Sequence, residues 1–137
     1  MAKDIIHLPV KKAIAKAGWT VTHDQYTVQF AEFTMYADLA AERVIAAQRG
    51  KDKIAIEIKS FVKRSAVQDV RDALGQYVMY HAYLAKIEPD RKLYMAVSAR
   101  AYRDVFSLKA VQFLVQQFTI ALIVVDIERE EIVVWND

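Results

Sequence analysis

The chain is expected to fold as a mixed α/β domain with a central sheet, and three observations predict this class. Alternating apolar residues indicate buried strands, a long amphipathic segment follows two of these strands, and the connections between segments are short. At 137 residues, with 55% apolar and 26% charged residues, the chain has the length and composition of one globular domain over residues 1–137.

Composition excludes several other classes of protein. The chain has no cysteine, so disulfides and thiolate metal sites are ruled out. The charged N-terminus does not resemble a signal peptide, and the most apolar segment, residues 120–125, is too short to cross a bilayer. We therefore expect a cytoplasmic protein with no membrane association. A net charge of +2 indicates that any polyanion is bound by a local patch or by the protein as part of an assembly.

The first half of the chain predicts a helix followed by strands. The helix is expected over residues 3–16, with Pro9 kinking it or delaying its start. Strand-like segments fill residues 19–36. Two further strands, ERVIAAQRG and DKIAIEIKSF, are expected to form a hairpin that turns at residues 49–52.

The second half predicts the longest helix, over residues 65–85. Its expected core stripe consists of Val67, Val70, Leu74, Tyr77, Val78 and His81. Gly75 lies inside this helix, and we expect close packing to require it. A strand at residues 91–98, helical segments and a closing strand pair complete the predicted domain.

The segment KIAIEIKSF carries the most informative pattern. Because residues two apart share a strand face, the isoleucines form one face, and Glu57 and Lys59 lie on the other. Asp38 stands at the entry to the preceding strand, where hairpin pairing would bring it near Glu57. Converging carboxylates, with the backbone carbonyl of Ile58, would suit Mg²⁺ or Mn²⁺, weakly held.

This constellation has two interpretations. In the first, Lys59 beside the cation positions water or stabilises charge on a phosphate, as in hydrolysis of a phosphodiester. In the second, Glu57 and Lys59 form a cross-strand ion pair, and Asp38 caps a turn. Basic residues are candidates for contact with a nucleic-acid backbone: Lys63 and Arg64 directly after the strand, and Lys12 on the first helix.

Asp38, the Glu57-Ile58-Lys59 run and the following helix resemble the PD-(D/E)XK nuclease superfamily, whose fold is a restriction-endonuclease-like mixed sheet flanked by helices. Longer segments resemble the XisH family of fdxN element excision controlling factors. These segments are DLAAERVIAAQRGKDKIAIEIKSF, ALGQYVMYHAYL, EPDRKLYMAVS and EEIVVW.

The resemblance implies roles for individual residues. Asp38, Glu57 and Lys59 correspond to the catalytic and metal-binding set, and Gln76 to a helical glutamine beside the site. Tyr80 shares the face of Gln76. Glu42 is either a further acidic ligand or points away along its strand.

Two departures from the superfamily pattern stand out. Ala37 occupies the position of the proline in the superfamily name. The first helix offers only Asp4 and His7, where some branches supply a glutamate ligand. A site for one metal ion is compatible with these departures.

Three functions follow as hypotheses. The first is a Mg²⁺-dependent endonuclease-like protein acting on DNA during excision of an element. The second is a non-catalytic DNA-binding or recombinase-accessory protein. The third is a module that binds a XisI-like partner, with a homodimer as another way to cover its apolar C-terminal strands.

Overall fold

A computed structural model of the chain describes residues 5–45, 50–62 and 65–136. Its elements follow the predicted order of helix, strands, long helix, strand, helices and strands, which confirms the mixed α/β class. The helices are α1 (His7–Lys16), α2 (Ala66–Ile87), α3 (Ala99–Asp104) and α4 (Lys109–Gln117). The strands are β1 (Thr20–His23), β2 (Tyr26–Phe30), β3 (Phe33–Ala37), β4 (Leu39–Ile45), β5 (Gly50–Ile58), β6 (Arg91–Ser98), β7 (Leu122–Asp126) and β8 (Glu131–Asn136).

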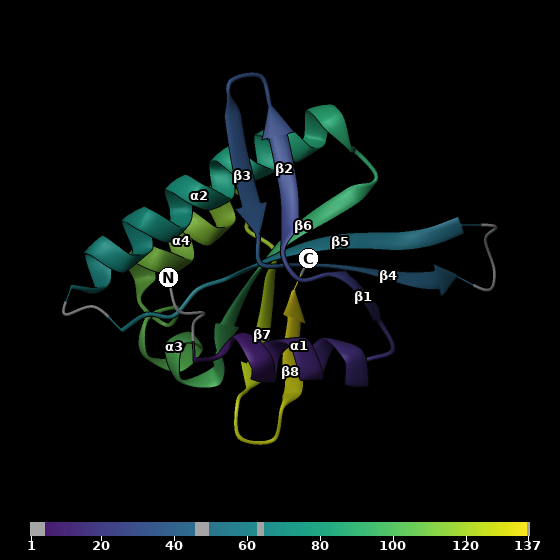
Figure 1. Cartoon of the computed structure of the whole chain (residues 1–137). Coiled ribbons are helices and arrows are strands. Elements are labelled where there is room, and N and C mark those ends of the chain that lie inside the picture. The colour runs from purple at the N-terminus through teal and green to yellow at the C-terminus, as the bar shows by residue number, and fades with distance from the viewer. Residues whose placement is uncertain (1–4, 46–49, 63–64, 137) are drawn as a thin grey trace.

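Six strands form one mixed sheet in the order β1-β4-β5-β6-β7-β8. The central pairs β5–β6 and β6–β7 are parallel, and the outer pairs β1–β4, β4–β5 and β7–β8 are antiparallel. The parallel pair β5–β6 is connected through α2, as parallel neighbours require a crossover. Figure 1 shows α2 and α4 on one side of this sheet and α1 on the other.

Each face of the sheet has its own hydrophobic core. Ile54, Ile56 and Ile58 pack with α1, whereas Ala55 packs with α2. Glu57 lies between Ile56 and Ile58 and therefore belongs to the α2 face, because alternate residues of a strand face opposite sides. The predicted alternation along β5 thus places its apolar side toward α1 and its charged side toward α2.

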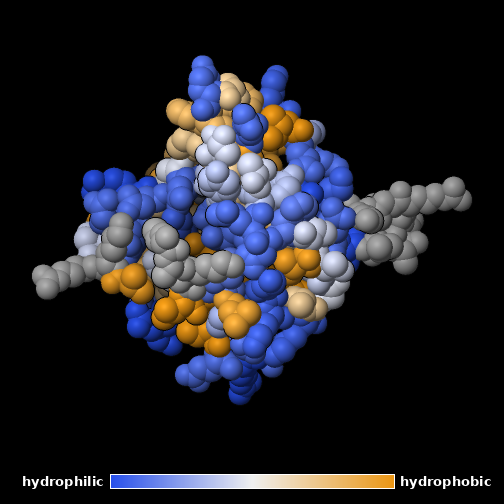
Figure 2. Space-filling model, in the orientation of Figure 1, coloured by the Kyte–Doolittle hydropathy of each residue, from blue (hydrophilic) through white to orange (hydrophobic). Residues whose placement is uncertain are grey.

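Strands β2 and β3 form a separate hairpin inserted between β1 and β4. It packs on α2, where Phe30 stacks on Tyr83 with ring centroids 4.7 Å apart. Figure 2 shows hydrophobic side chains gathered at this end of the molecule, and further hydrophobic side chains lower on the same face. Exposed aromatic residues Phe33 and Tyr36 belong to β3. Because β3 ends at Ala37, the hairpin also delivers Asp38 to the start of β4.

The turn between β4 and β5 was predicted at residues 49–52, and this prediction was wrong. Gly50 pairs with Ile45, and Asp52 pairs with Arg43, so residues 50–52 belong to β5. Arg49 lies outside the described residues. The ladder continues to Leu39 opposite Ile56, and β4 therefore begins earlier than the pattern ERVIAAQRG indicated.

The first helix begins later than expected, at His7. Pro9 lies in the first turn of the helix. Backbone N–H groups there have no acceptor within the helix, so a proline loses no hydrogen bond at this position. Residues 3 and 4 of the expected helix lie outside the described residues. None of the helices in the described ranges is both long and apolar enough to cross a bilayer.

The stripe predicted for α2 was only partly right. Tyr77 is buried, and Val70 and Leu74 pack against the core, but Val67, Val78 and His81 are exposed. The buried positions of α2 are Asp69, Ala73, Tyr77, Tyr80 and Leu84. The helix is thus rotated so that a partly polar face covers the charged side of β5.

Close packing does not explain Gly75. It is exposed, and a Cβ built on it meets nothing within 4 Å. A glycine here raises the entropy lost on folding with no compensating contact.

We predict that Gly75→Ala stabilises the protein by about 0.5–1 kcal/mol, since alanine favours the helical backbone. Urea unfolding measures the free energy directly. The matched control is Ala82→Gly, an exposed position of the same helix that should lose about as much stability. A destabilised Gly75→Ala variant would show that the helix needs the glycine.

Candidate acidic site on the α2 face

The register of β4 and β5 positions the two carboxylates of the site. Leu39 pairs with Ile56, so Asp38, one residue before Leu39, comes opposite Glu57, one residue after Ile56. The Ile58 amide N–H donates a hydrogen bond to Asp38 Oδ2 at 2.7 Å, which ties the start of β4 to the end of β5. The Asp38 carboxylate also hydrogen-bonds with the Glu57 carboxyl. The structure thus brings Asp38 and Glu57 together on one side of the sheet.

Glu57 is buried, and only 5% of its surface is exposed. Burial raises the pKa of Glu57 to about 9, and the hydrogen bond and negative charge of Asp38 contribute in the same direction. The Lys59 ammonium opposes this shift and lowers the pKa. Without a cation, the protonated form of Glu57 is therefore favoured at neutral pH.

Two buried oxygens of this region have no hydrogen-bond partner. They are Glu57 Oε2 and Gln76 Oε1. Gln76 lies on α2 one turn before Tyr80, so both side chains leave the same face of the helix. Buried acceptors are normally satisfied, and an orphan oxygen indicates a missing proton donor, water or cation.

Tyr80 is a buried neighbour of the acidic pair. Its hydroxyl donates to the Tyr36 carbonyl at 3.2 Å, which binds α2 to the β2–β3 hairpin. Burial raises the pKa of Tyr80, and the negative charges of Glu57 and Asp38 raise it further. Tyr80 thus stays neutral and positions α2 over the acidic pair. The Tyr36 carbonyl has no signal in the sequence, because any residue could supply it.

The donor set fits a hard divalent cation, since it offers two carboxylates, and one oxygen of the Glu57 carboxylate has no partner. The Ile58 carbonyl is adjacent in sequence to both Glu57 and Lys59. Within the described ranges, no group of three or more His, Cys, Asp or Glu side chains could hold a metal ion. Any cation would therefore be held by few protein ligands and would be bound weakly.

Glu42 is not near Asp38 and Glu57. It pairs with Lys53 across the ladder, and its Oε2 lies 3.7 Å from Arg91 Nη2. Arg91 is buried, binds Glu88 at 2.8 Å and donates to the Ile54 carbonyl at 3.0 Å. This network lies on the α2 face away from the acidic pair, and Glu42 therefore points away from Asp38 along β4.

The other candidates separate into two groups. Lys12 lies on α1, on the opposite face of the sheet, with its Nζ 3.6 Å from Glu130 Oε2. Lys63 and Arg64 lie outside the described residues. The histidines are not near the acidic pair: His7 contacts Asp24, His23 contacts Thr22, and His81 stacks on Tyr77.

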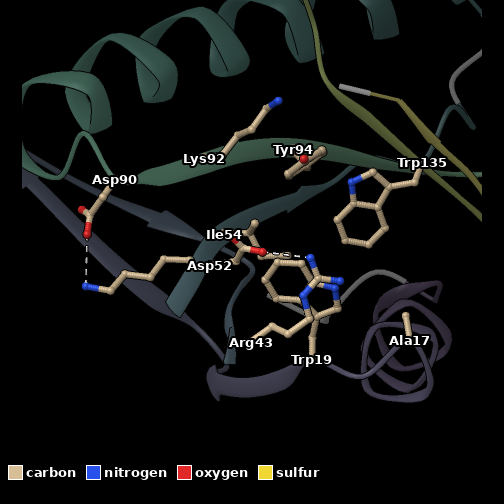
Figure 3. A pocket seen from close by; sticks show the side chains of 10 residues that line it. Ala17, Trp19, Arg43, Asp52, Ile54, Asp90, Lys92, Tyr94 and Trp135 are labelled. Atoms are coloured by element: carbon tan, nitrogen blue, oxygen red, sulfur yellow. Dashed lines mark hydrogen bonds and ion pairs between the residues drawn. The ribbon is translucent and has the colours of Figure 1, made fainter. Parts of the chain in front are cut away.

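A concave site on the α1 face was not anticipated from the sequence. Trp19, Arg43, Lys92 and Tyr94 line it together with Trp135 (Figure 3). These residues come from β1, β4, β6 and β8 or the residues beside them, at spacings that form no local motif. The two tryptophans, Trp19 and Trp135, were the only signal for this site in the sequence.

The fold and the acidic pair define a mixed α/β protein with a two-carboxylate site on the helix-covered face of its central sheet. Residues 1–133 match the family model described as XisH protein. The chain belongs to the XisH family. No curated protein matches it.

Two solved structures are similar over almost the entire chain. An XisH family protein from Nostoc punctiforme PCC 73102 is 32% identical with a TM-score of 0.88, covering 98% of this chain and 100% of that one. A fdxN element excision controlling factor protein from Anabaena variabilis is 37% identical with a TM-score of 0.88 and the same coverage.

We predict that Glu57→Gln removes a pH-dependent loss of stability. The native pKa of about 9 exceeds the ordinary value of 4.5, so the native state binds more protons than the unfolded state between these values. The contribution of Glu57 is therefore complete below pH 4.5 and declines as pH rises toward 9.

Glutamine cannot ionise, so the variant should become more stable than the wild type as pH rises, by on the order of 2–3 kcal/mol at pH 7. Unfolding by urea at several pH values measures this difference. Glu131→Gln, at an exposed position of β8, is the control and should follow the wild type. Parallel curves for wild type and Glu57→Gln would show that Glu57 is not protonated in the fold.

Proposed function

We propose that this protein controls the programmed excision of a DNA element and acts on DNA phosphodiesters as a Mg²⁺- or Mn²⁺-dependent endonuclease-like protein of the PD-(D/E)XK type. One observation carries the proposal: Asp38 and Glu57 converge beside Lys59, and Glu57 Oε2 is buried without a partner. The excision role is supported by the similarity to the Anabaena variabilis protein, which is named an excision controlling factor. For this action on DNA we propose a cytoplasmic location.

Each residue of the site has a proposed role. Asp38, Glu57 and the Ile58 carbonyl would hold the cation, which would supply Lewis-acid stabilisation of phosphate charge and a more acidic water. Lys59 places a positive charge next to the Glu57 carboxyl, where it can stabilise negative charge developing on a phosphate. The buried Gln76 Oε1 can accept a hydrogen bond from the attacking water and orient it.

Weak binding of the cation is consistent with this mechanism. Two carboxylates and a carbonyl leave about half of the positions of an octahedral ion to water and to substrate phosphate oxygens. We propose that DNA itself completes the coordination. We propose that Lys63 and Arg64, which follow β5 and Lys59 in the sequence, contact the DNA backbone.

Lys12 has no part in this contact, because it is on the α1 face. A XisI-like protein and a second copy of the chain stay predictions for partners. The exposed aromatic residues of β3, next to Asp38, support a partner that covers the hairpin.

The alternative function is a non-catalytic DNA-binding or recombinase-accessory protein. It is favoured by the high pKa of Glu57, since a protonated carboxyl does not bind a cation. In this case the acidic pair would be a structural hydrogen bond between β4 and β5. Cleavage assays distinguish the two functions.

We predict that the purified protein cleaves duplex, branched or single-stranded DNA when Mg²⁺ or Mn²⁺ is present, and not in EDTA. Glu57→Ala and Lys59→Ala should each reduce the rate by at least about 100-fold, because each removes a charge from the reacting centre. Glu128→Ala and Lys109→Ala, which make the same charge changes at exposed sites, are the controls.

Equal cleavage by wild type, Glu57→Ala and Lys59→Ala would contradict the proposal and indicate a contaminating nuclease. Shifted DNA mobility with no cleavage by any protein would select the accessory function.

Binding of the cation has a separate readout. We predict that Mn²⁺ raises the thermal unfolding midpoint of the wild type, because it binds only the folded acidic pair. Asp38→Asn should lose most of this rise, and Glu128→Gln should retain it. An equal rise in Asp38→Asn would place the cation elsewhere.

A further inference from the structure

A cleft of about 570 Å³ opens on the face of the sheet opposite to Asp38 and Glu57 (Figure 3). Its volume falls within the range of small-ligand sites. Three aromatic side chains and three cationic side chains line it: Trp19, Tyr94 and Trp135, with Arg43, Lys53 and Lys92. We call this set the aromatic cleft. It belongs to the core on the α1 side, so it is separate from the acidic site.

The aromatic rings of the cleft support one another. Trp19 stacks on Trp135 with centroids 5.6 Å apart and planes 11° apart, and Tyr94 meets Trp135 edge to face at 5.1 Å. The Arg43 guanidinium lies over the Trp19 ring at 4.6 Å. The result is a rigid layered platform that ends in a guanidinium with about half of the Arg43 side chain exposed.

The orientation of Arg43 is held from two directions. Asp52 Oδ2 accepts a hydrogen bond from Arg43 Nη2 at 2.8 Å, and Trp19 supports the guanidinium plane from below. An arginine plane fixed in this way is a stacking surface for a nucleobase, because the base and the guanidinium are both flat and the contact is favourable for every base.

A cation on the neighbouring strand β6 provides for a phosphate. Lys92 Nζ lies 5.3 Å from the Tyr94 ring centroid, on the α1 side of the sheet. Among the charged residues that line the cleft, cations outnumber carboxylates by three to two, which favours an anionic ligand.

We propose that the aromatic cleft binds a nucleobase that carries a phosphate, with the base stacked on the Arg43–Trp19 platform and the phosphate on Lys92. Free nucleotides and single-stranded nucleic acid share this chemistry. The site does not depend on a metal ion or on the acidic pair, and it would let the protein hold an unpaired strand on the face away from its candidate cleavage site.

Intrinsic fluorescence tests the proposal directly, because the chain has two tryptophans and both line the cleft. The probes are thymidine monophosphate and a single-stranded oligothymidylate, each titrated in EDTA. We expect saturable quenching that weakens as salt rises. Arg43→Ala and Lys92→Ala should each weaken the apparent affinity by at least about tenfold. Lys109→Ala, an exposed lysine of α4, should leave it unchanged.

Saturation by both probes would identify free nucleotides as sufficient ligands, and saturation by the oligonucleotide alone would identify single-stranded nucleic acid. Quenching that persists unchanged in Arg43→Ala and Lys92→Ala would overturn the proposal, and so would no quenching by either probe. Circular dichroism of each variant confirms folding. Both probes are titrated in EDTA, without the metal ion that cleavage requires, so failure of the cleavage hypothesis and failure of this one are distinguishable.

Discussion

The antiparallel pairing of β4 with β5 is the constraint on which the rest of the structure depends. It sets Leu39 opposite Ile56 and allows Asp38 to accept the Ile58 N–H at 2.7 Å. A slip of one residue would turn Glu57 into the isoleucine face and would place an isoleucine against α2. Both hydrophobic cores oppose such a slip, so the geometry of the acidic pair is stabilised by apolar packing on both sides of the sheet.

The same strands serve two faces with different chemistry. Toward α2 they present the carboxylates of Asp38 and Glu57, and α2 adds a neutral tyrosine and an orphan glutamine oxygen. Toward α1 they present aromatic rings with an arginine and lysines at the rim. Period-two alternation allows this division, because substitutions on one face do not alter the side chains of the other. One small domain can thus carry two independent sites.

The fold disfavours the charged form of the Glu57 carboxyl in the acidic site. Burying Glu57 beside Asp38 raises its pKa to about 9, whereas Lys59 acts in the opposite direction. A cation would reverse this balance, because it stabilises both carboxylates at once. An ordinary cross-strand ion pair stabilises its own charges. Here the charged form of Glu57 is unfavourable without a cation, and such a strongly shifted pKa is typical of functional sites.

The local spacing of apolar residues determined the class of fold, the order of its elements and which face of β5 is apolar, because alternation and helical spacing are properties of neighbouring residues. It also selected Asp38, Glu57 and Lys59 as a group. The tertiary structure alone decided the face that α2 buries, the separation of Glu42 and Lys12 from the acidic pair, and the assembly of the aromatic cleft. Those outcomes depend on packing between segments far apart in the chain. Trp19 and Trp135 stack across the fold although more than a hundred residues separate them, and no periodicity in the sequence encodes such a contact.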